Sequence, residues 1–129
     1  MTNNRHRDRI KHFTAFGQNL PHAKVYYRED WQIIYFDLAG KMFGLMSPTL
    51  SDTAIITLKG KPDSNEELRD LYADISAGYH VNKRHWISVK LKTEELSDQE
   101  IDAMIKQSYL LVVNNLPVNI RQRITENNL

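Results

Sequence analysis

The middle of the first half of the chain reads, from Val25 to Lys59, VYYREDWQIIYFDLAGKMFGLMSPTLSDTAIITLK. Runs of aromatic, β-branched and other apolar residues are typical of strands, and there are four here: 25–28, 31–37, 41–46 and 53–59. The separators between these runs are short enough for hairpins: Glu29-Asp30, Ala39-Gly40 and Ser47-Pro48. Parallel pairing would instead need crossovers of a dozen or more residues. The stretch therefore predicts four strands in an antiparallel meander.

A helix is expected before this sheet, from about residue 5 to residue 20, because apolar residues recur there on one helical face. Gly17 and Pro21 are stop signals, since glycine tolerates a left-handed cap and proline cannot continue the hydrogen-bond ladder. This helix should end near Asn19.

Two S-x-x-E pairs after the sheet fit helix capping boxes. The first, Ser64 with Glu67, is followed by apolar residues at helical spacing as far as Ile75. Residues 76–84 are expected as a loop, and residues 86–91 alternate like a fifth strand. The second pair, Ser97 with Glu100, opens a long helix that Pro117 ends, and residues 120–124 can add a short turn.

The expected fold class is therefore α+β. It has an antiparallel sheet with helices packed on one face, in the order helix, four strands, helix, strand, helix. A chain of 129 residues without internal repeats or linkers is long enough for one core, so residues 1–129 form a single domain. We expect residues 1–8 to be a flexible basic arm.

The apolar runs and the cysteine content of the sequence indicate the cellular compartment. The first twenty residues contain no apolar run that could serve as a signal-peptide core, and the longest apolar stretch, 110–113, is far short of the ~20 residues that span a bilayer. The chain has no cysteine, which fits a reducing interior. We expect a cytoplasmic protein without membrane contact.

Motifs of catalysis are absent from the sequence. There is no G-x-S-x-G elbow, no glycine-rich phosphate loop and no H-E-x-x-H pair. His80 and His85 are five residues apart, a spacing that matches no standard zinc pattern. We therefore expect no enzymatic activity, no catalytic residue, no metal site and no cofactor.

Charge is unevenly distributed although the formal net charge is only +1. Residues 1–28 contain six Lys or Arg and one Asp, for a net +5, and residues 79–92 contain four Lys or Arg and no acid, for a net +4. Cations at the start of a helix oppose its dipole, so these residues do not stabilise the helix. One interpretation is an arm that follows nucleic-acid phosphates through Arg5, Arg7, Arg9 and Lys11; the other is a solvated tail.

The densest polar cluster is GYHVNKRHW, residues 78–86. Lys83 and Arg84 can hold phosphates, and Asn82, His80 and His85 offer further hydrogen bonds. Trp86 or Tyr79 can stack on an exposed base. The alternative is structural: Trp86 packs in the core, His85 bonds to backbone, and the two cations extend into water.

At this cluster the sequence resembles the MmcQ/YjbR family. The resemblance rests on His80-Val81-Asn82-Lys83-x-His85-Trp86 and on later matches at Leu96-Ser97-Asp98, Ser108-Tyr109 and Leu116-Pro117. It implies a small bacterial protein with a frataxin-like α+β sandwich, in a family commonly described as DNA-binding. It places that role on Asn82, Lys83, His85 and Trp86, and also on Tyr109, whereas Arg84 occupies a variable position and rests on its charge alone.

A frataxin-like fold also suggests iron handling as a function, which the frataxin family associates with an acidic first helix. Here the first helix is basic and would repel Fe²⁺, so the chemistry of the site outweighs the fold analogy. The leading hypothesis is a non-enzymatic DNA-binding protein, a monomer or weak homodimer, that grips the phosphate backbone.

Two alternatives stay open. The first is a protein-interaction or adaptor module, which an uncovered outer face of the strand at 33–36 would favour because that run is apolar on both sides. The second is a small-ligand pocket between Trp86, Tyr109 and the sheet.

Overall fold

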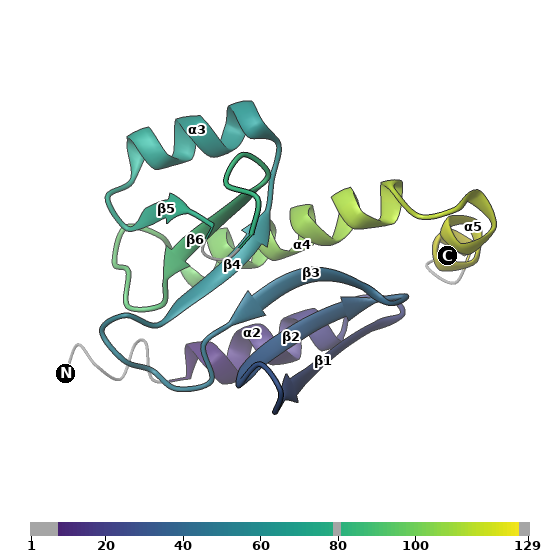
Figure 1. The fold of residues 1–129 in the computed structure, drawn as a ribbon, viewed down its shortest axis with the longest axis horizontal. Helices are drawn as coiled ribbons and strands as arrows, with labels where there is room; N and C mark the ends of the chain where they lie inside the picture. The colour runs from purple at the N-terminus through teal and green to yellow at the C-terminus, as the bar shows by residue number, and fades with distance from the viewer. Residues whose placement is uncertain (1–7, 79–80, 127–129) are drawn as a thin grey trace.

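The computed structural model describes residues 8–78 and 81–126. Figure 1 shows one twisted sheet with helices packed against it. The elements follow one another as α2 (Arg9–Gln18), β1 (Ala23–Arg28), β2 (Ile33–Leu38), β3 (Lys41–Met46), β4 (Ile55–Lys59), α3 (Pro62–Leu71), β5 (Ile75–Ala77), β6 (Trp86–Lys90), α4 (Asp98–Asn114) and α5 (Val118–Glu126). The predicted α+β class and the order of its main elements are confirmed.

The sheet is antiparallel throughout, in the order β1-β2-β3-β4-β6-β5. The four-stranded meander is therefore as predicted. The short strand β5 departs from the prediction of a helix as far as Ile75 followed by a loop, because α3 ends at Leu71 and Ile75 pairs with Val89 of β6. Burial of Ile75 between β6 and the core favours the strand over another helical turn.

Helix starts follow one of the two predicted capping boxes. Ser97 accepts a hydrogen bond from the Glu100 amide, and the Glu100 carboxylate accepts one from the Ser97 amide, so the second box is confirmed. The first is wrong: α3 begins earlier, with Lys61 at the N-cap and Pro62 in its first turn. Proline fits that position because its fixed φ is helical and it has no amide to leave unpaired.

The core lies on one face of the sheet. Phe36, Leu58 and Val89 point from β2, β4 and β6 toward α4, which contributes Ile101 and Ile105. Alternation along the strands sends their neighbours to the opposite face. Within the described residues no helix packs over that opposite face, which we call the helix-free face. It carries Tyr26, Arg28, Ile33, Tyr35, Met42, Leu45, Ile55, Thr57, Trp86 and Ser88.

None of the helices in residues 8–78 and 81–126 is long and apolar enough to cross a membrane.

Candidate nucleic-acid interface

The basic loop, which we define as residues 82–85, leads into β6 through a turn organised by Asn82. Asn82 Oδ1 accepts hydrogen bonds from the amides of Arg84 at 2.9 Å and His85 at 3.2 Å. The Asn82 carbonyl accepts one from the Trp86 amide at 3.1 Å. Asn82 was predicted to contact nucleic acid, and its side-chain oxygen is already used to shape the turn. Its amide NH₂ is the part that a ligand can still use.

A second asparagine, Asn65, anchors the basic loop to α3. Asn65, in the first turns of α3, is 1% exposed, and its Nδ2 donates to the carbonyls of Gly60 and Arg84, both at 3.0 Å. The Gly60 amide donates to the His85 carbonyl at 2.9 Å. A Cβ on residue 60 would fall 2.1 Å from Asn65 Oδ1, so this clamp requires glycine there. The basic loop is thus tied to both α3 and the end of β4.

Sequence reasoning missed Asn65. A polar residue near the start of a helix looks solvated, and the carbonyls it binds lie 5 and 19 residues away. Its only sequence signal is the neighbouring Gly60, which also fits an ordinary strand end.

The charged side chains of the basic loop face solvent. Lys83, Arg84 and His85 are all exposed, and within the described part of the chain their side chains form no ion pair. Their charge is therefore available to a ligand. Among the described residues, the backbone of His85 and not its ring takes part in the hydrogen bonds of the loop, which does not fit the structural alternative for this residue.

Trp86 is half-buried, so it is neither fully exposed for stacking on a base nor fully packed in the core. It is the first residue of β6 and pairs with Lys59 of β4. Paired residues in an antiparallel sheet point to the same face, so Lys59 adds a further cation beside the indole.

The predicted basic arm is corrected at Arg9. Its side chain is 3% exposed, and its Nε donates to Asp98 Oδ1 at 2.8 Å. Its two terminal nitrogens donate to the carbonyls of Leu91, Thr93 and Leu96, each at 2.9 Å. A guanidinium with these partners cannot reach a phosphate. Arg9 is a structural residue, and the prediction that it binds nucleic acid is wrong.

Of the remaining arm residues, Lys11 is described by the structure, and it lies apart from the basic loop. Arg5, Arg7, His80 and Tyr79 lie outside the described residues. Lys11 is exposed on α2, which packs against β1, whereas the basic loop adjoins β6. Four strand spacings, or about 19 Å, separate β1 from β6. The structure therefore brings together residues 82–86 and leaves Lys11 apart from them.

The helix-free face carries an aromatic cluster around Arg28. The Arg28 guanidinium carbon lies 3.9 Å from the Trp31 ring centroid and 4.9 Å from that of Tyr35. Tyr26 and Tyr35 have ring centroids 5.7 Å apart. The guanidinium also bonds to Asp30, with Nη2 and Oδ2 2.6 Å apart, and this hydrogen bond lowers the pKa of Asp30.

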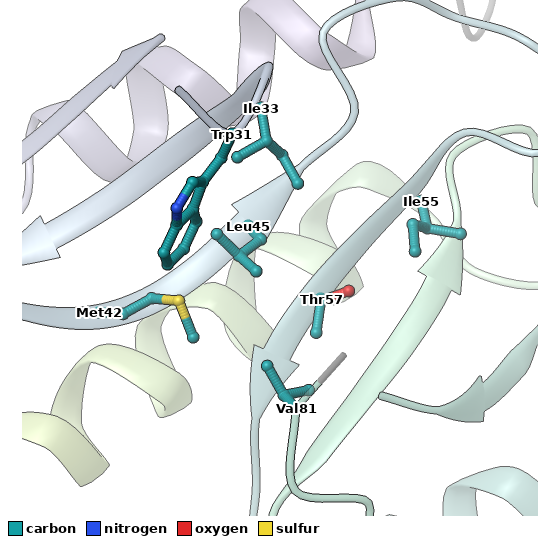
Figure 2. Close-up of a pocket in the computed structure, with 7 residues that line it drawn as sticks. All are labelled: Trp31, Ile33, Met42, Leu45, Ile55, Thr57 and Val81. Atoms are coloured by element: carbon teal, nitrogen blue, oxygen red, sulfur yellow. The ribbon is translucent and has the colours of Figure 1, made fainter. Parts of the chain in front are cut away.

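A hollow of about 370 Å³ lies beside this cluster on the same face (Figure 2). The alternative pocket between Trp86 and Tyr109 is ruled out by their positions. Trp86 belongs to the helix-free face, whereas Tyr109 packs edge-on against Phe43 in the core and donates to the Pro21 carbonyl at 2.7 Å. Burial in the core raises the pKa of Tyr109.

Metal binding finds no ready site in the part of the chain that the structure describes, where no three His, Asp or Glu side chains are grouped suitably.

Comparison with known proteins gives a consistent set of relatives. The YjbR family model matches residues 18–111. The uncharacterized protein YbdF of Escherichia coli O157:H7 is 36% identical over 89 residues, which cover 69% of this chain and 71% of YbdF. The uncharacterized protein YjbR of Escherichia coli K12 is 28% identical over 117 residues, covering 91% of this chain and 98% of YjbR.

Solved structures agree with the fold. A crystal structure of a Deinococcus radiodurans protein with a DUF419 domain superposes with a TM-score of 0.79 at 27% identity, covering 90% of this chain and 87% of that one.

Proposed function

Since this chain belongs to the YjbR family, we propose that it is a non-enzymatic DNA-binding protein that holds backbone phosphates on its basic loop. The observation that supports this proposal is the set of three consecutive exposed side chains, Lys83, Arg84 and His85, on a turn fixed by two asparagines. A loop that is ordered before binding loses less conformational entropy when it meets its ligand. The arrangement suits recognition of a rigid polyanion.

The chemistry of the basic loop fits phosphate oxygens. Lys83 offers a compact charge with three donors, and Arg84 offers a planar fork that can bind two oxygens at once. Lys59 supplies another charge next to Trp86. Phosphate contacts position a protein on the duplex without reading its sequence. The proposal is therefore binding with little sequence preference.

Fluorescence anisotropy with two labelled duplexes of unrelated sequence tests this proposal. Affinity should fall steeply between about 50 and 200 mM salt, because each neutralised phosphate releases counterions. In the double variant Lys83→Ala/Arg84→Ala, the slope of log affinity against log salt should become shallower by about 2, roughly one for each lost contact. The two duplexes should behave alike.

A matched control removes the same charge elsewhere. Lys41→Ala/Lys106→Ala takes two exposed lysines from β3 and α4, and it should leave the slope near that of the unmodified protein. If both double variants change the slope equally, only the net charge matters and the basic loop has no special role. No binding to either duplex at low salt would overturn the proposal.

Protein–protein interaction is a second candidate function, favoured by the aromatic cluster. Trp31 is 53% exposed and Tyr26 is also exposed, and Trp, Tyr and Arg are the residue types that most often dominate interfaces. With a second copy of this chain as the partner, the sedimentation coefficient should rise as concentration increases toward about 100 µM. The variant Trp31→Ala should abolish that rise, and a wild type that stays monomeric would exclude self-association through this cluster.

A further inference from the structure

We infer that the hollow on the helix-free face is a binding site for a small, uncharged, mainly apolar molecule. It is formed by Ile33 of β2, Met42 and Leu45 of β3, Ile55 and Thr57 of β4, with Trp31 and Val81 from the adjoining turns. Figure 2 shows these side chains around a common space, which Trp31 and Val81 border from different sides. Its volume of about 370 Å³ lies within the range of small-molecule pockets.

The floor of the hollow is formed by the sheet itself. Leu45 is 8% exposed and Thr57 is 2% exposed, although no helix in the described residues covers them. Leu45 pairs directly with Thr57 across β3 and β4, so the two side chains lie together on this face. A molecule resting there would contact a surface held by strand pairing and would not need to order it.

The polar groups of the floor are already satisfied. The Thr57 hydroxyl lies 2.8 Å from the Ser88 hydroxyl, and the two form a buried hydrogen bond. The other lining side chains are aliphatic, a thioether and an indole. A water molecule needs two to four polar partners to be held in a cavity, and these walls supply few. An apolar occupant is therefore better matched to this hollow than water.

None of the seven lining side chains is charged, so the lining does not favour an anion. Arg28 stacks on Trp31, but its charge is paired with Asp30 at 2.6 Å. A charged ligand resting on the floor would lose hydration without meeting a charged side chain in the lining, because the exposed Lys90 lies opposite Ile55 and only borders the hollow. This separates the hollow from the basic loop, whose cations form no ion pair with any residue in 8–78 and 81–126, so the inference does not rest on the proposed DNA binding.

The test uses the neutral fluorescent probe N-phenyl-1-naphthylamine with the full chain. Its emission should rise saturably as protein is added, with one site per chain. In a Trp86→Phe background Trp31 is the sole tryptophan, so transfer of its excitation to the bound probe should locate the probe beside this ring. The anionic relative 1-anilinonaphthalene-8-sulfonate should bind at least about tenfold more weakly.

Two variants alter the hollow in different ways. Met42→Lys places a charge in its wall and Ile55→Trp fills its space; both residues are half-buried, so either change can be accommodated in the fold. Each should weaken probe binding at least about tenfold. Leu110→Lys, at an exposed apolar residue of α4, is the matched control and should change binding less than about twofold. Circular dichroism verifies that each variant is folded.

Three results would overturn the inference. The first is probe binding that does not saturate, and the second is equal binding by the wild type and by folded Met42→Lys and Ile55→Trp. The third is a wild type that dimerises in sedimentation experiments and binds no probe, with Met42→Lys restoring the monomer. That outcome would assign the face to a second copy of the chain. Anisotropy with DNA is measured separately, so a failure here leaves the proposed function untouched.

Discussion

Arg9 Nε donates a hydrogen bond of 2.8 Å to Asp98 Oδ1, which joins the first turn of α2 to the first turn of α4. The same guanidinium satisfies three carbonyls in the segment that leads from β6 into α4. Arginine suits this position because its planar group presents five donors in fixed directions. One buried side chain therefore fastens α2 to the start of α4 and to the segment that precedes it.

Replacing Arg9 should destabilise the fold. Arg9→Met keeps much of the side-chain volume but leaves three carbonyls and a carboxylate without their donor, and we expect a loss of about 3 kcal/mol in the free energy of unfolding. Urea denaturation followed by circular dichroism measures it. Lys11→Met, on the exposed side of the same helix, should stay within about 0.5 kcal/mol of the wild type. Equal stability of the two variants would contradict the structural role of Arg9.

Gly17 should resist replacement by alanine even though alanine favours helices. Gly17 lies in the last turn of α2, which ends at Gln18 with Asn19 as its C-cap, as its stop signals predict, and a Cβ on it would fall 2.7 Å from Phe36 Cε2. Alanine gains about 1 kcal/mol in helix propensity, while overpacking a core costs about 1–3 kcal/mol. We expect Gly17→Ala to lower the free energy of unfolding by about 1 kcal/mol. A thermal melt that rises instead would show that Phe36 yields readily.

The sheet was predictable because its signal is local. Alternating apolar residues and short separators specify strands and hairpins without reference to the rest of the chain, and the meander from β1 to β4 follows them. Ile75 shows where this fails. Its spacing from Leu68 fits a helix, and only its pairing with Val89 of a later strand makes it part of β5.

The residue types of the candidate site could be predicted from the sequence, but which of them are exposed and which are structural could not. Exposed cations at residues 83 and 84 follow from charge in a loop. The buried role of Arg9 does not, because its carbonyl partners lie 82 to 87 residues away. The hollow was missed for a similar reason: its lining comes from three strands and two turns, which share no local pattern.

Asn65 should stabilise both the fold and the conformation of the basic loop. Asn65→Ala removes both donors to the Gly60 and Arg84 carbonyls, and we expect a loss of about 1–3 kcal/mol in the free energy of unfolding. Amide hydrogen exchange of residues 82–86 should speed up more than that of β2, because the basic loop loses its attachment to α3.

Ser64→Ala, at the exposed neighbouring position of the same helix, is the control and should leave exchange in the basic loop unchanged. If Asn65→Ala speeds exchange equally in β2 and in the basic loop, Asn65 supports the whole fold and has no special role in the loop.

Asp30 should titrate below its ordinary pKa because of Arg28. The hydrogen bond from the guanidinium lowers the Asp30 pKa from its usual 3.8. A carboxyl whose pKa is lower in the folded state stabilises the fold above the ordinary value, and that contribution disappears as the pH falls through the lowered pKa. Carboxyl titration by NMR should therefore place the midpoint of Asp30 below 3.8.

Arg28→Ala should return the Asp30 midpoint toward the ordinary value. The Asp52 carboxyl is an internal control, because its pKa is lowered by a hydrogen bond from Lys92 and should not respond to the change at residue 28. Arg28→Ala also removes the cation stacked on Trp31. An Asp30 midpoint that stays low in this variant would mean that Arg28 is not its partner in solution. In the unmodified protein the charge of Arg28 would then be free at the rim of the hollow. An anionic probe should in that case bind the unmodified protein as well as a neutral probe does.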